Sequence, residues 1–169
     1  MQPEIELLDR IKTKDQKALA ELMEMYGRLV YHQAVTILRN QTDADDVYQE
    51  VFVKVYRYAE SCKGTSVKAW ISRITFNCCM DLIAKNKKQQ QAIESLSAED
   101  SIANSENPQK SSFAELISGY TIDEKEILTM RFVSRLSYAE IAQTTGRAEG
   151  SLRNLICKLV KSLRQELVK

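Results

Sequence analysis

The chain contains few residues that would interrupt a helix. Of its 169 residues, five are glycine and two are proline. No segment of useful length alternates apolar and polar residues, which is the pattern of a half-buried β-strand. Apolar residues instead recur at spacings of three and four along nearly the whole chain. The sequence therefore predicts an all-α fold.

Residues for metal chemistry and for catalysis are also scarce. His32 is the single histidine, and the four cysteines form no Cys-x-x-Cys pair: Cys62, Cys78, Cys79 and Cys157. A zinc site needs ligands at hairpin or helical spacing, so we expect no metal and no other cofactor, and we interpret the cysteines as small thiols, with a redox switch as a weaker hypothesis. The sequence has no phosphate-binding glycine loop and no nucleophile beside a histidine, so we do not expect an enzyme.

Long apolar runs are missing as well. No segment approaches the length needed to cross a bilayer, and the first fifteen residues lack the apolar centre of a signal peptide. We therefore expect a cytoplasmic protein.

The formal net charge of +1 hides an uneven distribution of charge. Residues 1–60 carry 8 basic and 11 acidic side chains, and residues 61–91 carry 6 and 1. Residues 92–126 carry 2 basic and 8 acidic side chains, and residues 127–169 carry 8 and 3. Two separate basic blocks are typical of a protein that contacts a polyanion at two places.

Helical periodicity and capping signals divide the chain into two small helical domains. In the first, residues 1–91, we expect helices over 4–13, 16–39, 42–59 with Thr42 as the cap, and 66–91 with Ser66 as the cap. Residues 92–112 are polar and acidic without an apolar stripe, which predicts a flexible linker. In the second domain, residues 113–169, a capping box of Thr121 and Glu124 opens a helix through Phe132.

The segment 137–161 has the pattern of a helix-turn-helix. Ser137 and Glu140 form a capping box at the start of a short helix, and Gly146 can adopt the left-handed conformation of the turn. The longer helix that follows has an apolar stripe and a basic opposite face. A short helix, a glycine turn and a basic second helix fit the major groove of DNA. An ordinary helical hairpin with a solvated basic face has the same pattern.

Residues 43–56 predict a helix with two distinct faces. Val47, Val51 and Val55 share one face, and four other residues lie on another: Asp46, Gln49, Glu50 and Val53. This acidic stripe suits a basic helical partner. The residues alone favour the simpler interpretation of a solvated helix face.

Three motifs in one order carry a family resemblance. DADDVYQEVFVKVY (43–56) is followed by AWISRITFN (69–77) and then by SYAEIA (137–142). This combination resembles regions 2 and 4 of the extracytoplasmic-function (ECF) sigma factors of bacterial RNA polymerase. The resemblance covers nearly the whole chain, from about residue 15 to 167. It implies a non-enzymatic subunit that joins core RNA polymerase, recognises promoter DNA and starts its melting.

The resemblance assigns roles to particular residues. It implies contacts to core polymerase by Asp46, Gln49, Glu50 and Val53. It implies contacts to the minus-ten promoter element by Lys63, Arg73, Asn77, Lys85, Lys87 and Lys88, beside a base pocket walled by residues 61–65. It implies contacts to the minus-thirty-five element by Arg147, Ser151, Arg153, Asn154, Cys157, Lys158 and Lys161. Asn77 matches the family's base-contacting asparagine.

Two positions depart from the family's pattern. A hydroxyl residue usually stands where this chain has Ala148, and an arginine where it has Leu155. The second helix therefore lacks its usual cap and one cation, and we expect weak intrinsic DNA binding that tethering to polymerase offsets. We interpret Trp70 as a core residue in preference to a base-stacking one.

The resemblance also implies an anti-sigma protein, often membrane-anchored, that covers the polymerase- and DNA-binding faces. The alternative is a stand-alone helix-turn-helix regulator whose N-terminal domain senses a ligand or dimerises. A sigma factor requires core polymerase to act on a promoter, whereas such a regulator binds its operator without it.

Overall fold

The fold is helical, as the sequence predicts. The computed structural model describes residues 3–64, 66–96 and 113–168, and every regular element in those ranges is a helix. The N-terminal domain contains α1 (Pro3–Lys12), α2 (Gln16–Leu38), α3 (Gln41–Tyr58), the 3₁₀ turn η1 (Ala59–Ser61) and α4 (Val67–Leu96). The C-terminal domain contains α5 (Phe113–Leu116), α6 (Ile122–Leu128), the π-helical turn η2 (Thr129–Val133), α7 (Tyr138–Thr145) and α8 (Glu149–Leu167).

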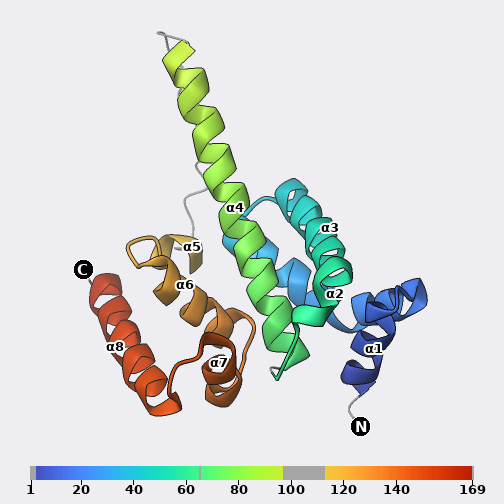
Figure 1. Cartoon of the computed structure of the whole chain (residues 1–169). Helices are drawn as coiled ribbons and strands as arrows, with labels where there is room; N and C mark the ends of the chain where they lie inside the picture. The colour runs from blue at the N-terminus through green and yellow to red at the C-terminus, as the bar shows by residue number, and fades with distance from the viewer. Residues whose placement is uncertain (1–2, 65, 97–112, 169) are drawn as a thin grey trace.

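Helix α4 is the central element of the molecule. It lies between α2 and α3 on one side and the C-terminal helices on the other, and its last turns project beyond both domains (Figure 1). The N-terminal core forms where α2, α3 and α4 meet, around Leu22, Val30, Val51, Ile71 and Phe76, each at most 1% exposed. This packing fixes the outward faces of α3 and α4.

The start of α3 differs from the prediction. Asn40, not Thr42, is the cap: Asn40 has extended backbone angles and its side chain accepts a hydrogen bond of 3.1 Å from the amide of Asp43. Asparagine is at least as good a cap as threonine, and it lies two residues earlier, so the helix begins at Gln41. Ser66, by contrast, is confirmed as a cap, since its hydroxyl accepts from the amide of Ala69 at 3.0 Å.

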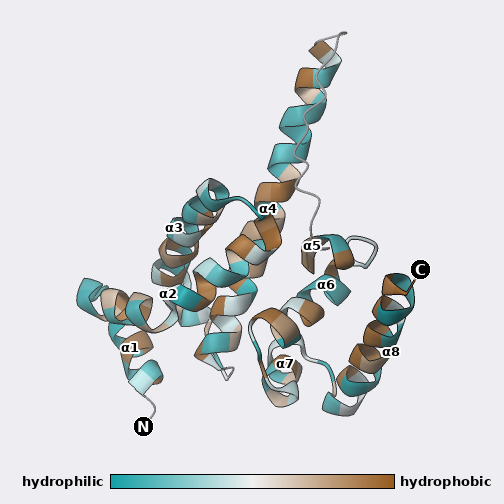
Figure 2. Cartoon of the chain, turned by 180° about the vertical axis from the view of Figure 1, so that it is seen from behind, coloured by the Kyte–Doolittle hydropathy of each residue, from teal (hydrophilic) through white to brown (hydrophobic). Residues whose placement is uncertain are grey.

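Helix α4 is also longer than expected. It ends at Leu96, whereas the prediction ended it near residue 91. The added residues, AIESL, include good helix formers and neither glycine nor proline. The projecting turns are largely hydrophilic (Figure 2). Residues 97–112, the rest of the predicted linker, lie outside the described residues.

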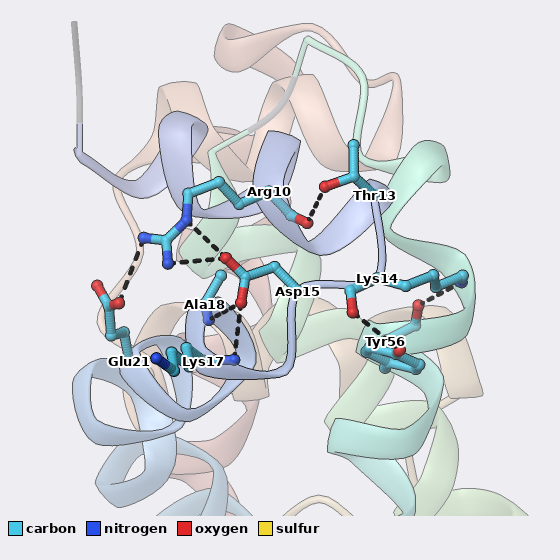
Figure 3. Close-up of polar contacts among 8 residues, drawn as sticks. All are labelled: Arg10, Thr13, Lys14, Asp15, Lys17, Ala18, Glu21 and Tyr56. Atoms are coloured by element: carbon cyan, nitrogen blue, oxygen red, sulfur yellow. Dashed lines mark hydrogen bonds and ion pairs between the residues drawn. The ribbon is translucent and has the colours of Figure 1, made fainter.

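The connection between α1 and α2 is held by a polar cluster (Figure 3). The Asp15 carboxylate caps α2 by accepting from the amides of Lys17 and Ala18, and it also accepts from Arg10 Nε at 2.9 Å. The hydrogen bond from Arg10 lowers the pKa of Asp15. Lys14, at φ 67°, is joined to Tyr56 of α3 in both directions, because its Nζ donates to the Tyr56 carbonyl and its own carbonyl accepts from the Tyr56 hydroxyl.

The C-terminal domain confirms both predicted capping boxes. Thr121 with Glu124 opens α6, and Ser137 with Glu140 opens α7. The helix predicted through residue 132 changes character at Thr129, where it widens into the π-helical turn η2, and the amide of Ser134 donates to the Thr129 carbonyl.

Candidate nucleic-acid interface

Helix α3 has the two faces that its sequence predicts. Ala44, Val47, Val51 and Val55 are buried against α2 and α4. The four residues expected to meet the polymerase are all exposed, and Val53 keeps 49% of its surface accessible: Asp46, Gln49, Glu50 and Val53. Glu50 forms an ion pair of 3.0 Å with Lys54, four residues along the helix. The exposed stripe thus combines two carboxylates with an apolar side chain.

An open hollow of about 780 Å³ adjoins this stripe. Gln49 and Val53 line it together with apolar and aromatic side chains from α2 and α3: Leu19, Met23, Tyr48, Phe52 and Tyr56. Lys14, which is hydrogen-bonded to Tyr56, also lines the hollow. The sequence predicted Gln49 and Val53 as contact residues but did not indicate the aromatic lining of the hollow. Tyr48 and Phe52 lie between the buried valine face and the exposed acidic face of α3, so neither face of the predicted helix included them.

The residues expected to contact the minus-ten element are spread along α4 and the turn before it. Lys63 lies in the turn, Asn77 on the middle of α4, and the last three on its projecting half: Lys85, Lys87 and Lys88. All five are exposed. Within the predicted pocket wall, Ser61 belongs to η1, and Thr65 lies outside the described residues.

Arg73 differs from the other candidates because it is already engaged. Its Nε lies 3.1 Å from a carboxylate oxygen of Glu126 in α6, and its Nη1 donates to the carbonyl of Thr144 at the end of α7 at 2.6 Å. Burial raises the pKa of Glu126, and the charge of Arg73 opposes that shift. The side chain nevertheless keeps 45% of its surface accessible.

Trp70 packs in the core, in agreement with the interpretation from sequence. It is 9% exposed, and its indole N–H donates to the Ser61 hydroxyl at 3.2 Å. This hydrogen bond ties the first turns of α4 to η1. Cys78 and Cys79, more than two turns further along α4, are buried, while Cys157 is exposed.

The helix-turn-helix has the predicted geometry. Gly146 adopts φ 71° between α7 and α8, and its amide donates to the Ala142 carbonyl. Ala148 begins α8 with extended angles and no side-chain cap, as its sequence implies. Leu155 is partly buried between two apolar clusters of the domain, so an arginine at this position would lose apolar packing.

The outward face of α8 and the turn before it expose every residue expected to meet the minus-thirty-five element: Arg147, Ser151, Arg153, Asn154, Cys157, Lys158 and Lys161. Arg153 forms an ion pair of 2.7 Å with Glu149, and its guanidinium lies 4.8 Å from the centre of the Tyr138 ring. Arg147 lies 3.7 Å from Asp123. The basic face therefore includes two cations with carboxylate partners.

Residues of η2 complete this face, and the sequence did not indicate them. The guanidinium of Arg131, like that of Arg153, lies over the Tyr138 ring, 4.5 Å from the ring centre. An open hollow of about 470 Å³ lies between η2 and α8, lined among others by Phe132, Cys157 and Arg164. The sequence could have indicated Arg164 as a DNA-facing residue, because it is a cation outside the apolar stripe of α8. No sequence pattern indicated Phe132.

In the described ranges, no three histidine, cysteine, aspartate or glutamate residues come together as a possible metal site. Likewise, none of the helices of residues 3–64, 66–96 and 113–168 is both long and apolar enough to cross a membrane.

Comparison with known proteins identifies the family. Residues 22–89 match the model of Sigma-70 region 2, and residues 112–163 match the model of Sigma-70, region 4. The chain is 30% identical over 167 residues to the ECF RNA polymerase sigma-E factor of Haemophilus influenzae, a match that covers 89% of this chain and 87% of that relative. The chain belongs to the ECF sigma factors.

One relative of this ECF sigma factor is longer than the chain. The chain is 26% identical over 170 residues to the ECF RNA polymerase sigma factor SigE of Mycolicibacterium smegmatis. The match covers 93% of the chain and 65% of that relative, so the chain spans just under two thirds of that protein. Its fold is similar to that of the sigma factor RpoE of Bartonella quintana, solved in complex with the anti-sigma factor NepR, at a TM-score of 0.61 and 17% identity over 89% of this chain and 97% of that one.

The two matched regions of the ECF sigma factor enclose the candidate residues. Region 2 contains α3 and the part of α4 through Lys88, and region 4 contains the helix-turn-helix. The family membership thus favours the sigma factor over the stand-alone regulator.

Proposed function

We propose that this chain directs core RNA polymerase to promoters with two recognition elements and starts DNA melting at the minus-ten element. The observation that carries this proposal is the pair of family matches, regions 2 and 4 in that order on one chain. The chain itself carries out no reaction; the polymerase does. Its place is the cytoplasm, where core polymerase and promoter DNA are found.

The exposed stripe of α3 is the proposed contact to core polymerase. Asp46 and Glu50 supply carboxylates and Val53 supplies an apolar contact beside the aromatic hollow. Complementary charge across an interface sets orientation and speeds association, while an apolar anchor in a hollow contributes most of the affinity. This division favours a helical partner with a basic face and one apolar anchor.

The outward side of α4 is the proposed reader of the minus-ten element. Capture of an unpaired base needs a polar group for the base edge and cations for the backbone. The exposed amide of Asn77 can serve the base edge, and Lys63 and the lysines of the projecting half can follow the phosphates. The proposed role of Arg73 is a phosphate contact.

The outward side of α8 is the proposed reader of the minus-thirty-five element. In a helix-turn-helix, the first residues of the second helix reach base edges in the major groove. Arg153 and Asn154 lie in the second turn of α8 and are exposed, so they suit base contacts. Arg147, Lys158 and Lys161 suit phosphates, and Ser151 and Cys157 lie between them.

An anti-sigma protein is the proposed regulator. The fold relative from Bartonella quintana is bound to an anti-sigma factor, and the stripe and hollow of α3 are surfaces on which such a protein would exclude the polymerase.

Run-off transcription tests the proposed function. Core polymerase is given a promoter library with and without the purified chain, and the products are sequenced. We expect new start sites that share two upstream elements. If the chain adds no start site but retards duplex DNA without polymerase, the regulator hypothesis replaces this one.

A further inference from the structure

Tyr138 is the first residue of α7, and its position is fixed from two directions. In the capping box just before it, the Glu140 amide donates to the Ser137 hydroxyl at 3.1 Å and the Ser137 amide donates to the Glu140 carboxylate at 2.8 Å. The Tyr138 side chain packs against the apolar cluster that includes Ile141 and Ile156. The residue is half-buried, so close packing restricts the orientation of its ring.

Two arginines from different elements meet at this ring. The guanidinium carbon of Arg131, from η2, lies 4.5 Å from the ring centre, and that of Arg153, from α8, lies 4.8 Å from it. Arg131 also donates from Nη1 to the Leu136 carbonyl at 2.9 Å, between η2 and α7. The electron-rich face of an aromatic ring attracts a cation. Tyr138 therefore links η2 to the proposed recognition helix through their arginines.

Arg153 has a second partner of a different kind. Its Nη2 donates to the Glu149 carboxylate at 2.7 Å, and the side chains of Arg153 and Glu149 are 59% and 45% exposed. An exposed ion pair of this kind adds little stability, and its carboxylate repels approaching phosphates. The face of Tyr138 attracts the guanidinium without adding a negative charge. The ring contact can therefore persist when DNA displaces Glu149.

The ring contact also leaves hydrogen-bond donors of Arg153 available. A guanidinium has five N–H donors in its plane, and its attraction to a ring face acts on the charge and needs no hydrogen bond. Arg153 lies in the second turn of α8, in the part of a recognition helix that reaches base edges. Ordering a long side chain during binding costs affinity, so an arginine that is already oriented loses less.

We propose that Tyr138 is a positioning residue for promoter recognition, whose ring orients Arg153 towards a base edge of the minus-thirty-five element. The inference rests on the proposed function of α8. An exposed contact between a cation and an aromatic ring changes an equilibrium about two- to fivefold. Loss of the ring should therefore weaken discrimination by about this factor at the base pair that Arg153 reads, and at no other.

Side-chain mobility tests the positioning. Nitrogen-relaxation NMR of the full chain reports the mobility of the Arg153 Nε–H bond, whose signal is identified by its absence in Arg153→Lys. Tyr138→Phe keeps the ring and removes the hydroxyl, whereas Tyr138→Leu keeps an apolar side chain and removes the ring. Trifluorophenylalanine in place of Tyr138 keeps the ring, but its fluorines withdraw electrons from the face that attracts the cation. Circular dichroism verifies that each chain keeps its helix content.

We expect Arg153 to be equally ordered in the parent chain and in Tyr138→Phe, and more mobile in Tyr138→Leu and in the trifluorophenylalanine chain. If Tyr138 only packs, trifluorophenylalanine should behave like phenylalanine, because the two side chains have nearly the same shape. Equal mobility of Arg153 in all of these chains would overturn the inference. If Tyr138→Leu does not fold, the trifluorophenylalanine chain gives the same comparison.

Promoter selection tests the consequence for recognition. Core polymerase with each chain transcribes a library randomised across the minus-thirty-five element, and sequencing of the products gives the base preference at every position. Arg153→Ala identifies the base pair that Arg153 reads. We expect Tyr138→Leu to lower the preference at that base pair about two- to fivefold, and to have no further effect in the Arg153→Ala background. Lys158→Ala, at a proposed phosphate contact, is the matched control and should lower transcription evenly across sequences.

The two readouts separate the failures. A mobile Arg153 with an unchanged base preference in Tyr138→Leu would contradict the role in recognition. A further loss in the Arg153→Ala background would show that Tyr138 does not act through Arg153, and would also overturn the inference. If the parent chain itself supports no transcription, the proposed function fails, while NMR still decides whether Tyr138 holds Arg153.

Discussion

The uncapped start of α8 gives a sharp test of how its first turn limits DNA recognition. Ala148 has φ −66° and ψ 138°, which are the backbone angles of a capping residue, and its carbonyl already accepts from the amide of Leu152 at 3.0 Å. It is exposed, so a larger side chain has room. Ala148→Thr should therefore supply the missing acceptor for the free amides of Gly150 or Ser151 without any change in the backbone.

The expected gain follows from the usual strength of a cap. Replacing alanine by a capping residue contributes about 1 kcal/mol, which is about a fivefold change in a local opening equilibrium. Hydrogen exchange of the Ser151 amide measures that opening directly in the full chain. We expect the amide to exchange about fivefold more slowly in Ala148→Thr than in the parent chain.

Ala148→Val is the matched control, because valine has the shape and the branched Cβ of threonine but no oxygen. If the Ser151 amide exchanges at the same rate in both variants, the hydroxyl of the threonine at position 148 does not cap the helix. Duplex binding by the same variants tests the functional link, since a pre-ordered first turn should tighten binding by no more than the measured change in opening. A gain in protection with unchanged affinity would show that the first turn does not limit recognition.

Three further results are expected. Asp46→Lys should abolish run-off transcription with core polymerase, while circular dichroism and thermal unfolding stay unchanged because Asp46 is exposed; a fully active variant would refute its role. Trp70→Phe should lower the free energy of unfolding by about 1–3 kcal/mol in urea, since it removes the bond to Ser61 and buried volume, and a loss below the error of the fit would contradict the core role. Burial acts to raise the pKa of Glu140, but the hydrogen bonds with Ser137 bring that pKa below its usual value. The ionised Glu140 side chain therefore stabilises the fold above pH about 4.3, and this stabilisation is lost as the pH falls through the lowered pKa. Glu140→Gln should remove this part of the acid dependence in thermal unfolding measured across pH, and a pH profile identical to that of the parent chain would count against it.

Local signals predicted most of the helices. The capping boxes of Thr121 and Ser137, the cap at Ser66 and the turn at Gly146 act over four residues or fewer, so they can be recognised in the sequence. The errors arose where two local choices compete. At the start of α3, Asn40 and Thr42 are both capping residues, and the three-dimensional path of the chain decides between them.

The exposed faces of α3 and α8 could be predicted because helical periodicity separates them from the core. The contacts across the domain boundary could not. Ser72 and Ser134 are 62 residues apart in the sequence, and a serine on a helix or turn does not indicate whether its partner is water or a distant side chain. Gln33 was expected on the inward face of α2, and a buried amide without a local partner is a signal that a polar group from elsewhere must reach it.

Several cations on the proposed DNA-binding surfaces form ion pairs with carboxylates of the same chain, and these pairs weaken the binding of the free chain to DNA. Three proposed DNA contacts lie beside carboxylates of the chain itself: Arg73 with Glu126, Arg147 with Asp123, and Arg153 with Glu149. The pairs of Arg147 and Arg153 are exposed, and such pairs stabilise a protein by about 0–1 kcal/mol, so a phosphate can displace their carboxylates at little cost. Glu126 is buried, so moving Arg73 away from it costs more. The displaced carboxylate nevertheless remains close to the DNA, and its repulsion offsets part of the attraction that the cation provides. Each such exchange also releases fewer counterions than an unpaired cation would, which flattens the dependence of affinity on salt. Weak binding of the free chain to duplex DNA is therefore expected even when all of these cations face the groove, and tethering both domains to one polymerase raises the effective concentration at the promoter enough to overcome it.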